Sequence, residues 1–275
     1  MLADLHTHSL YSFDGVSEAT LQNIAERAIA LGLSHIAITD HCDIDCELAG
    51  LYQPFDKKKV FDAISAVKET YKNKLCVLVG LELGGAHYCP RETRALLEAN
   101  PYDIVLGSIH NLPGEKDFHF FDFAHIDEDA TRAYFDRVIA EELELCELGG
   151  VQVLTHLTYM DRYLHRAGKA LNIAPHLDGL KRLFEKILQK GLTLELNTST
   201  LADGFGMPSA EILALYRSCG GTRVCLGSDA HTPVKIAQSF PAACRLLSEC
   251  GFTELTLPTR EGVLTYPIPK EIKHV

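Results

Sequence analysis

The sequence predicts an α/β fold in which short buried strands alternate with amphipathic helices. Apolar runs of strand length are separated along the chain by longer segments with apolar residues at helical spacing. The length of 275 residues suits an α/β barrel, because barrels of this size commonly fold as one unit. No internal repeat or Ser/Gly-rich linker divides the chain, so we expect a single domain over residues 1–275.

The predicted strands and helices follow one another in a regular order. Strands are expected at residues 2–5, 35–39, 76–81, 104–107, 151–155, 192–196 and 223–226. Helices are expected at residues 17–31, 57–71, 91–99, 128–148, 175–189, 209–217 and 234–250. The first helix is expected to start with Ser17 as its N-cap and to stop at Gly32. The proline-containing tail from Thr253 onward is expected to be irregular or edge structure on the surface.

The composition indicates a soluble protein with a large core. Hydrophobic residues make up 47% of the chain and charged residues 23%, which is ordinary for a globular domain. No apolar run approaches the ~18 residues of a membrane span, and the start of the chain does not resemble a signal peptide. We therefore expect a cytoplasmic protein without a membrane partner. The nine cysteines, odd in number and never spaced C-x-x-C, are expected to be reduced thiols.

The net charge makes nucleic acid an unlikely partner. The formal charge is -11 at pH 7, whereas general nucleic-acid binding needs a basic surface that faces the phosphates. Acidic ligands of divalent cations would account for part of this excess, because bound cations offset their charge.

Two histidines near the start of the chain have the spacing of metal ligands. Residues 4–8 read D-L-H-T-H, and in a strand the side chains of residues i and i+2 point to the same face. His6 and His8 are therefore expected to face one site. This pair alone does not distinguish a metal site from two ordinary polar residues on a strand.

The other predicted strands end in similar residues. These are Asp40 and His41 in I-T-D-H, Glu82 in G-L-E, His110 in G-S-I-H, His156 in V-L-T-H, and Asp229 and His231 in G-S-D-A-H. A single such residue often caps a helix or binds a loop backbone. In a barrel of parallel strands, however, the carboxyl ends meet on one rim, so six strands would direct imidazoles and carboxylates to one place. This pattern indicates a metal centre on the rim.

Five of these motifs, in order, resemble those of the PHP (polymerase and histidinol phosphatase) superfamily. They are H-T-H-S at 6–9, I-T-D-H at 38–41, G-L-E at 80–82, G-S-I-H at 107–110 and S-D-A-H at 228–231. The resemblance covers nearly the whole chain. Within it, residues 102–123, YDIVLGSIHNLPGEKDFHFFDF, are similar to the monofunctional histidinol-phosphate phosphatases more than to the polymerase-associated or nucleotide-cleaving branches.

The resemblance implies a distorted (β/α)7 barrel that holds three divalent metal ions. Its motif positions imply His6, His8, Glu82 and Asp229 for the first ion, Glu82, His110 and His156 for the second, and Asp14, His41 and His231 for the third. Asp14 is assigned only by its offset from the first motif. Imidazoles and carboxylates without thiolates suit Zn, Mn or Fe and do not choose among them.

The activity that the resemblance implies is hydrolysis of a phosphate monoester. The expected reaction converts L-histidinol phosphate to L-histidinol and phosphate, a step of histidine biosynthesis. A water that bridges the first two ions is expected to lose a proton and attack phosphorus, because metal binding lowers the pKa of water to about 7 in favourable sites. The alternatives are a PHP-type phosphoesterase for nucleotides or another small phosphorylated metabolite, and a metal-binding module without catalytic activity.

Three further residues are predicted to assist the reaction. Arg162, six residues after His156, is predicted to bind the phosphate bidentately, with a solvent-facing loop cation as the alternative. Asn197, just past the sixth strand, is predicted to contact the substrate, and capping of the next loop is equally compatible with its position. Asp40 is predicted to orient a ligand or to move a proton.

Overall fold

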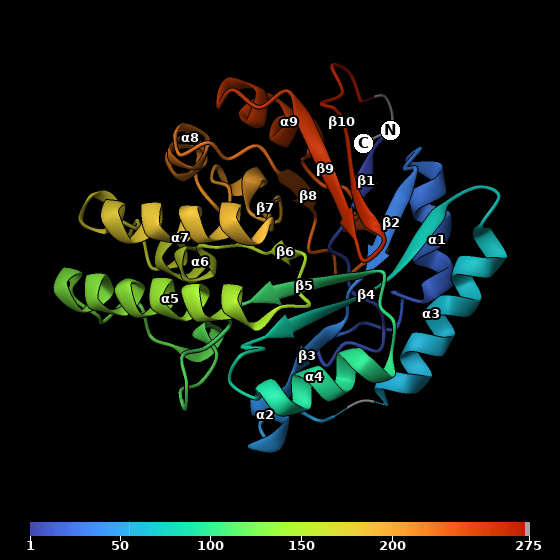
Figure 1. The fold of residues 1–275 in the computed structure, drawn as a ribbon, viewed down its shortest axis with the longest axis horizontal. Coiled ribbons are helices and arrows are strands. Elements are labelled where there is room, and N and C mark those ends of the chain that lie inside the picture. The colour runs from blue at the N-terminus through green and yellow to red at the C-terminus, as the bar shows by residue number, and fades with distance from the viewer. Residues whose placement is uncertain (55, 273–275) are drawn as a thin grey trace.

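Eight parallel strands form the central sheet of the computed structural model, which describes residues 1–54 and 56–272. The strands are β1 (Ala3–Asp4), β2 (His35–Ile38), β3 (His41–Asp43), β4 (Cys76–Gly84), β5 (Ile104–Ser108), β6 (Val153–Leu154), β7 (Thr193–Asn197) and β8 (Val224–Gly227). Seven of them pair in the order β1-β2-β4-β5-β6-β7-β8, and β3 pairs with β4. The sheet curls so that β1 and β8 approach each other (Figure 1).

Backbone hydrogen bonds from the residues after β1 to β8 and to the residues after it close the sheet into a barrel. The N–H of Leu5 donates to the carbonyl of Leu226 (3.1 Å), and the N–H of His8 donates to the carbonyl of Ala230 (2.9 Å). The predicted α/β class and the distorted (β/α)7 barrel are therefore confirmed. The sequence did not predict β3, a three-residue strand whose His41 lies beside Glu82 of β4.

The helices surround the barrel (Figure 1). They are α1 (Leu21–Ala30), α2 (Ile44–Leu48), α3 (Lys57–Tyr71), α4 (Pro90–Ala99), α5 (Glu128–Leu148), α6 (Tyr159–Arg166), α7 (Leu177–Lys190), α8 (Ala210–Ser218) and α9 (Phe240–Glu249). Each of the longer helices buries an apolar stripe against the strands, as α7 does with Leu180, Leu183, Phe184 and Ile187. The predicted ranges 57–71 and 128–148 coincide with α3 and α5.

Two of the predicted helix starts are wrong, and two short helices were not predicted. Helix α1 begins at Leu21 rather than near Ser17, because Thr20 is the N-cap and its side chain accepts the N–H of Asn23. Helix α9 begins at Phe240, after a separate 3-10 turn at Pro233–Lys235. The short helices α2 and α6 were not predicted.

The C-terminal tail is also more regular than predicted. It forms an antiparallel hairpin of β9 (Glu254–Thr259) and β10 (Gly262–Pro267), in which Leu255, Leu257 and Tyr266 are buried. The alternating leucines point to the interior and stabilise the hairpin through burial of apolar surface.

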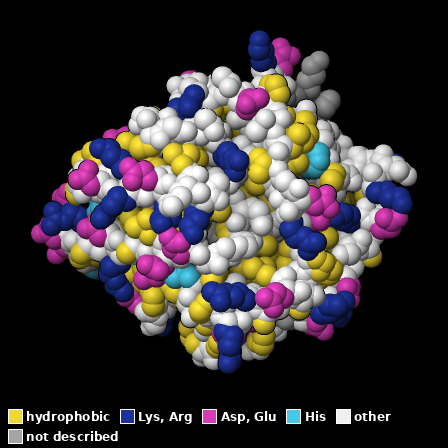
Figure 2. Space-filling model, in the orientation of Figure 1, with side chains coloured by type: hydrophobic (Ala, Val, Ile, Leu, Met, Phe, Trp, Pro, Cys, Tyr) yellow, Lys and Arg dark blue, Asp and Glu magenta, His cyan; other side chains and the backbone are white. Residues whose placement is uncertain are grey.

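The face of the molecule in Figure 2 carries basic and acidic side chains close to one another. Among the described residues, this face presents no continuous basic surface of the kind that nucleic-acid phosphates require. The exclusion of nucleic acid as a partner stays a prediction. Within residues 1–54 and 56–272, no helix combines the length and apolar character needed to cross a membrane.

Candidate metal centre

Four buried side chains converge at the carboxyl ends of β1, β4 and β8. The Nε2 atoms of His6 and His8 lie 3.1 Å apart. Oε2 of Glu82 lies 3.2 Å from the first of these nitrogens and 3.5 Å from the second, and Oδ1 of Asp229 lies 3.7 Å and 3.3 Å from them. A tetrahedral ion with ligands at ~2.1 Å has ligand atoms ~3.4 Å apart. The four atoms therefore enclose a space of the size that one metal ion needs.

The second oxygen of Glu82 faces another pair of imidazoles. Its Oε1 lies 2.9 Å from Nε2 of His156 and 3.1 Å from Nε2 of His110. Glu82 is fully buried, and each of its oxygens serves a different group of nitrogens. This is the geometry of a carboxylate that bridges two cations. Three protein donors at the second position leave room for water or substrate, as in catalytic metal sites.

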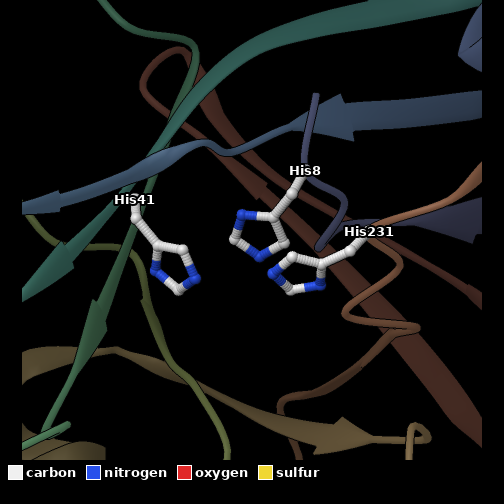
Figure 3. A group of neighbouring side chains, drawn as sticks. All are labelled: His8, His41 and His231. Carbon is white, nitrogen blue, oxygen red and sulfur yellow. The ribbon is translucent and has the colours of Figure 1, made fainter. Parts of the chain in front are cut away.

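A third group lies at the more exposed edge of the centre. Oδ2 of Asp14 lies 2.7 Å from Nε2 of His231 and 3.8 Å from Nε2 of His41. The rings of His8, His41 and His231 come from three separate segments and lie beside one another (Figure 3). The ring of His8 stacks on the ring of His41, with centroids 4.3 Å apart, and on the ring of His231, with centroids 4.1 Å apart. Donor atoms of the three rings lie within 4.8 Å of one another.

Unpaired polar atoms test whether these residues fit metal ions. Oε2 of Glu82, Nδ1 of His41 and Nε2 of His231 are buried and form no hydrogen bond of good geometry. Nδ1 of His41 lies 2.9 Å from Oε2 of Glu82, and Nε2 of His231 lies 2.7 Å from Oδ2 of Asp14, so these donors and acceptors face one another without pairing fully. Such atoms are costly unless something else satisfies them. Burial raises the pKa of Glu82, but the imidazoles around it, first His41 and then His6, hold that pKa well below its usual range, so the carboxylate is charged. The donor set, charge and unpaired atoms all fit divalent cations.

Two of the converging residues have a strained backbone. His156 has a φ of 25° and Asp229 a φ of 52°, a region that residues other than glycine adopt in only a few per cent of cases, Asn, Asp and His more often than the rest. Each such residue costs about 1–3 kcal/mol, and strain of this kind concentrates at functional sites. The strain places both side chains toward Glu82 and His8.

All nine predicted ligands are brought together in these three groups, and Arg162 lies next to them. Arg162 is in helix α6 rather than in a loop as predicted. Its Nη2 donates to Oδ2 of Asp229 (2.8 Å) and to Oγ of Ser199 (2.6 Å), and its guanidinium lies 5.1 Å from the ring centre of Tyr159. Arg162, Asp229 and His231 line one cleft of about 490 Å³. The cleft therefore opens beside the metal centre.

Asp40 and Asn197 are buried, and their observed contacts are with the protein. Asp40 accepts hydrogen bonds from the N–H (2.6 Å) and the hydroxyl (2.7 Å) of Ser9, the residue after His8. Asn197 accepts from the N–H (3.1 Å) and the hydroxyl (2.6 Å) of Ser199. These contacts hold the segments that carry His8 and line the cleft. Catalysis by Asp40 and substrate contact by Asn197 stay predictions.

Two buried carboxylates behind the centre were not among the predicted site residues. Nδ1 of His110 donates to Oδ1 of Asp43 (2.7 Å), and Nδ1 of His6 donates to Oε1 of Glu195 (2.8 Å). A signal for them exists in the sequence. Asp43 lies two residues after His41, and Glu195 interrupts the apolar strand L-E-L, where a charge needs a partner.

Comparisons with known proteins agree with this geometry. The sequence model of the PHP domain family matches residues 4–199. A histidinol-phosphatase of Lactococcus lactis is 27% identical over 261 residues, covering 92% of each chain, and a "probable histidinol-phosphatase" of Thermotoga maritima is 26% identical over 267 residues, covering 95% of this chain and 98% of the relative.

A crystal structure has the same fold. It is that of a histidinol phosphate phosphatase from Lactococcus lactis complexed with zinc, L-histidinol and phosphate. It superposes with a TM-score of 0.79 at 24% sequence identity, covering 96% of this chain and 98% of that one.

Proposed function

The chain belongs to the PHP domain family, and from this premise we propose that it is a phosphatase that hydrolyses L-histidinol phosphate to L-histidinol and phosphate. The observation that carries the proposal is the placement of Glu82, whose two oxygens each face a separate group of imidazoles. The full-length match to relatives named histidinol-phosphatase supports the choice of substrate. We take the whole chain, residues 1–275, as one metallophosphoesterase domain.

The proposed centre holds three divalent ions, which are Zn, Mn or Fe. The ligands would be His6, His8, Glu82 and Asp229 for the first ion, Glu82, His110 and His156 for the second, and Asp14, His41 and His231 for the third. Bound divalent cations supply positive charge to phosphoryl oxygens and lower the pKa of water. The buried side chains of this protein keep the site rigid, so little reorganisation is needed during the reaction.

Arg162 is the side chain that we propose for binding the phosphate. Its Nη2 is held by Asp229 and Ser199, which fixes the plane of the guanidinium at the cleft wall. Among the described residues, no side chain or backbone atom hydrogen-bonds its Nη1, which is therefore left to donate to a phosphoryl oxygen. Because Nη2 already donates to Asp229 and Ser199, the phosphate contact would come from Nη1 and not from the parallel pair of donors that a bidentate contact uses.

The same cleft offers groups for the other end of the substrate. Asp203 lines it, and no other described residue forms an ion pair with this carboxylate. Phe205 also lines it, with the His165 ring stacked on it at 3.8 Å between ring centres and 5° between planes. We propose that Asp203 pairs with the ammonium group of histidinol phosphate and that this aromatic wall packs beside the imidazole.

A substrate panel tests the proposed function. Phosphate release by the metal-loaded protein is measured with L-histidinol phosphate, nucleoside monophosphates, short single-stranded DNA, a sugar phosphate and p-nitrophenyl phosphate. We expect the highest kcat/KM with L-histidinol phosphate. A value no better than that for the sugar or aryl phosphate would overturn this substrate, and a preference for nucleotides would support the nucleotide phosphoesterase instead.

Two variants complete the test. His110→Ala is expected to remove hydrolysis while the fold is retained, and absence of turnover in both proteins would support a binding module without catalytic activity. Asp203→Asn is expected to raise KM for L-histidinol phosphate about tenfold, with little change for p-nitrophenyl phosphate, which has no ammonium group. An equal change for both substrates would contradict the role of Asp203.

A further inference from the structure

Two buried carboxylates stand behind the imidazoles of the centre, and neither is among the nine predicted ligands. Glu195 of β7 accepts the Nδ1–H of His6, and Asp43 of β3 accepts the Nδ1–H of His110. All four side chains are at most 4% exposed. In each pair the Nδ1 atom is occupied, so the Nε2 atom on the other side of the ring is directed into the centre.

Each carboxylate packs against a glycine at the end of a strand. A methyl group at Gly227, the last residue of β8, would lie 1.9 Å from Oε1 of Glu195 and 2.6 Å from Cβ of His6. A methyl group at Gly84, the last residue of β4, would lie 1.6 Å from Oδ1 of Asp43 and 2.8 Å from Nδ1 of His110. Both carboxylate–imidazole pairs therefore occupy space that exists only because these strands end in glycine.

The two carboxylates differ in how many ligands they hold. Besides His6, Glu195 binds His156: its Oε2 accepts the backbone N–H of this residue at 2.9 Å. That backbone is the strained one with a φ of 25°. Glu195 thus connects a residue of the first group with a residue of the second, on the side opposite Glu82. Asp43 accepts a hydrogen bond from one ligand, His110 of the second group.

We propose that Glu195 and Asp43 are positioning residues of the metal centre, Glu195 for the first and second ions and Asp43 for the second ion only. The inference rests on the proposed metal centre and goes beyond it. A carboxylate behind a ligating imidazole fixes the tautomer and the ring orientation and makes Nε2 a better donor. Gly227 and Gly84 are part of the same arrangement, because the absence of a side chain at these positions leaves room for the carboxylates.

Metal retention tests this proposal directly. Protein loaded with zinc is dialysed against graded concentrations of a chelator, and the ions per chain are counted by mass spectrometry. We expect Glu195→Ala to lower the affinity for two ions and Asp43→Ala to lower the affinity for one, each by about 10–100-fold. The pH profile of hydrolysis is measured in parallel, because a weaker Nε2 donor shifts the profile and a merely structural role does not.

Amide variants separate position from charge. In Asp43→Asn the amide oxygen still accepts the Nδ1–H of His110, so we expect retention close to that of the wild type. In Glu195→Gln one of the two acceptor oxygens becomes an NH2 group, which cannot accept from both His6 and His156. The glutamine variant is therefore expected to lose more metal than the asparagine variant.

Glycine substitutions provide a test without changing a polar group. Gly227→Ala is expected to reproduce the loss in Glu195→Ala, and Gly84→Ala that in Asp43→Ala. The matched control is Gly179→Ala in α7, where the added methyl meets the nearest atoms of Ile139 at 3.5 Å, an ordinary contact. We expect this control to bind metal like the wild type.

The outcomes distinguish this inference from the proposed function. Wild-type protein without bound metal would overturn both. Wild-type protein that binds metal, together with alanine and glycine variants of unchanged affinity, would overturn the positioning role alone. Thermal unfolding of the metal-free proteins identifies any variant that fails to fold. If the alanine or glycine variants fail to fold, Glu195→Gln is compared with Asp43→Asn. Greater metal loss in Glu195→Gln supports the proposal, and equal metal retention in the two overturns it.

Discussion

The two halves of the centre are built differently. In the buried half, around Glu82, side chains such as His6 and His156 are at most 2% exposed, and His6 has a carboxylate behind it. In the open half, which consists of Asp14, His41 and His231, the side chains of His231 and Asp14 are 28% and 38% exposed. Nδ1 of His231 donates to the backbone carbonyl of Asp229 (3.1 Å) rather than to a buried carboxylate.

This difference indicates that the protein prearranges the buried half before metal binds. Burial, strained backbone and second carboxylates fix its donors, whereas the side chains of Asp14 and His231 in the open half are partly exposed. An ion in the open half is therefore expected to exchange more easily than the ions of the buried half.

The largest effect is expected from Glu82→Gln in the buried half. The amide lacks the charge and the second acceptor that both imidazole groups face, so we expect loss of two ions and a decrease in kcat of about 10³-fold or more. Ion content and phosphate release measure this. Glu211→Gln on α8, which is exposed, is the control, and a Glu82→Gln protein with a tenth of wild-type activity would contradict the bridging role.

A smaller effect is expected from His231→Ala in the open half. We expect loss of one ion with retention of the other two, and a decrease in kcat of about 10²-fold. Asp14→Asn should behave in the same way because both residues face the same position. Loss of all ions in either variant would show that the two halves are not separable.

A still smaller effect is expected at Arg162, which lies between the centre and the cleft. Lysine places a compact ammonium where the planar guanidinium spreads its donors between Asp229, Ser199 and the cleft, so Arg162→Lys is expected to raise KM about tenfold. Steady-state kinetics measure this, with Arg94→Lys on the exposed side of α4 as control. An unchanged KM would remove Arg162 from phosphate binding.

The smallest effect is expected on the pH dependence of stability, through Glu142 near the buried half. Burial raises the pKa of Glu142 in α5 well above 4.5, so the folded protein keeps this group protonated where the unfolded chain ionises. Its contribution to stability is complete below pH 4.5 and falls as pH rises toward the folded pKa, by at most about 1.4 kcal/mol per pH unit.

The Glu142→Gln variant lacks this titration. Its melting temperature relative to wild type should therefore increase between pH 5 and pH 8, by about 2 °C or more. Metal-free proteins are compared by calorimetry at both values. A difference that is independent of pH would show that the interior beside the buried half is accessible to water.

The sequence predicted the ligands of the buried half better than the carboxylates behind them. The strand ends carry His6, His8, Glu82, His110 and His156 in patterns that the chemistry of metal ligands makes recognisable. Asp43 and Glu195 lie in strands as well, but their roles depend on which imidazole is adjacent across the sheet. Register is set by the three-dimensional pairing of strands, and a single sequence does not report it.

The elements that were missed have local reasons. Helix α6 is only eight residues long, and β3 has three residues and begins at His41, the last residue of the I-T-D-H motif, so neither was predicted. The tail was predicted irregular because of its prolines, yet Leu255 and Leu257 alternate as strand residues do. Packing of these leucines against the barrel outweighed the cost of Pro258, which pairs with Val263 in the two-stranded hairpin.

The most direct test of the two-part centre is a chelator titration in which metal content and hydrolysis of L-histidinol phosphate are followed together. Wild-type protein is expected to start near three ions per chain, to lose one ion first with partial loss of activity, and to lose the remaining two together with all activity. Full activity with a single ion, or loss of all ions in one step, would contradict a centre with a buried half and an open half.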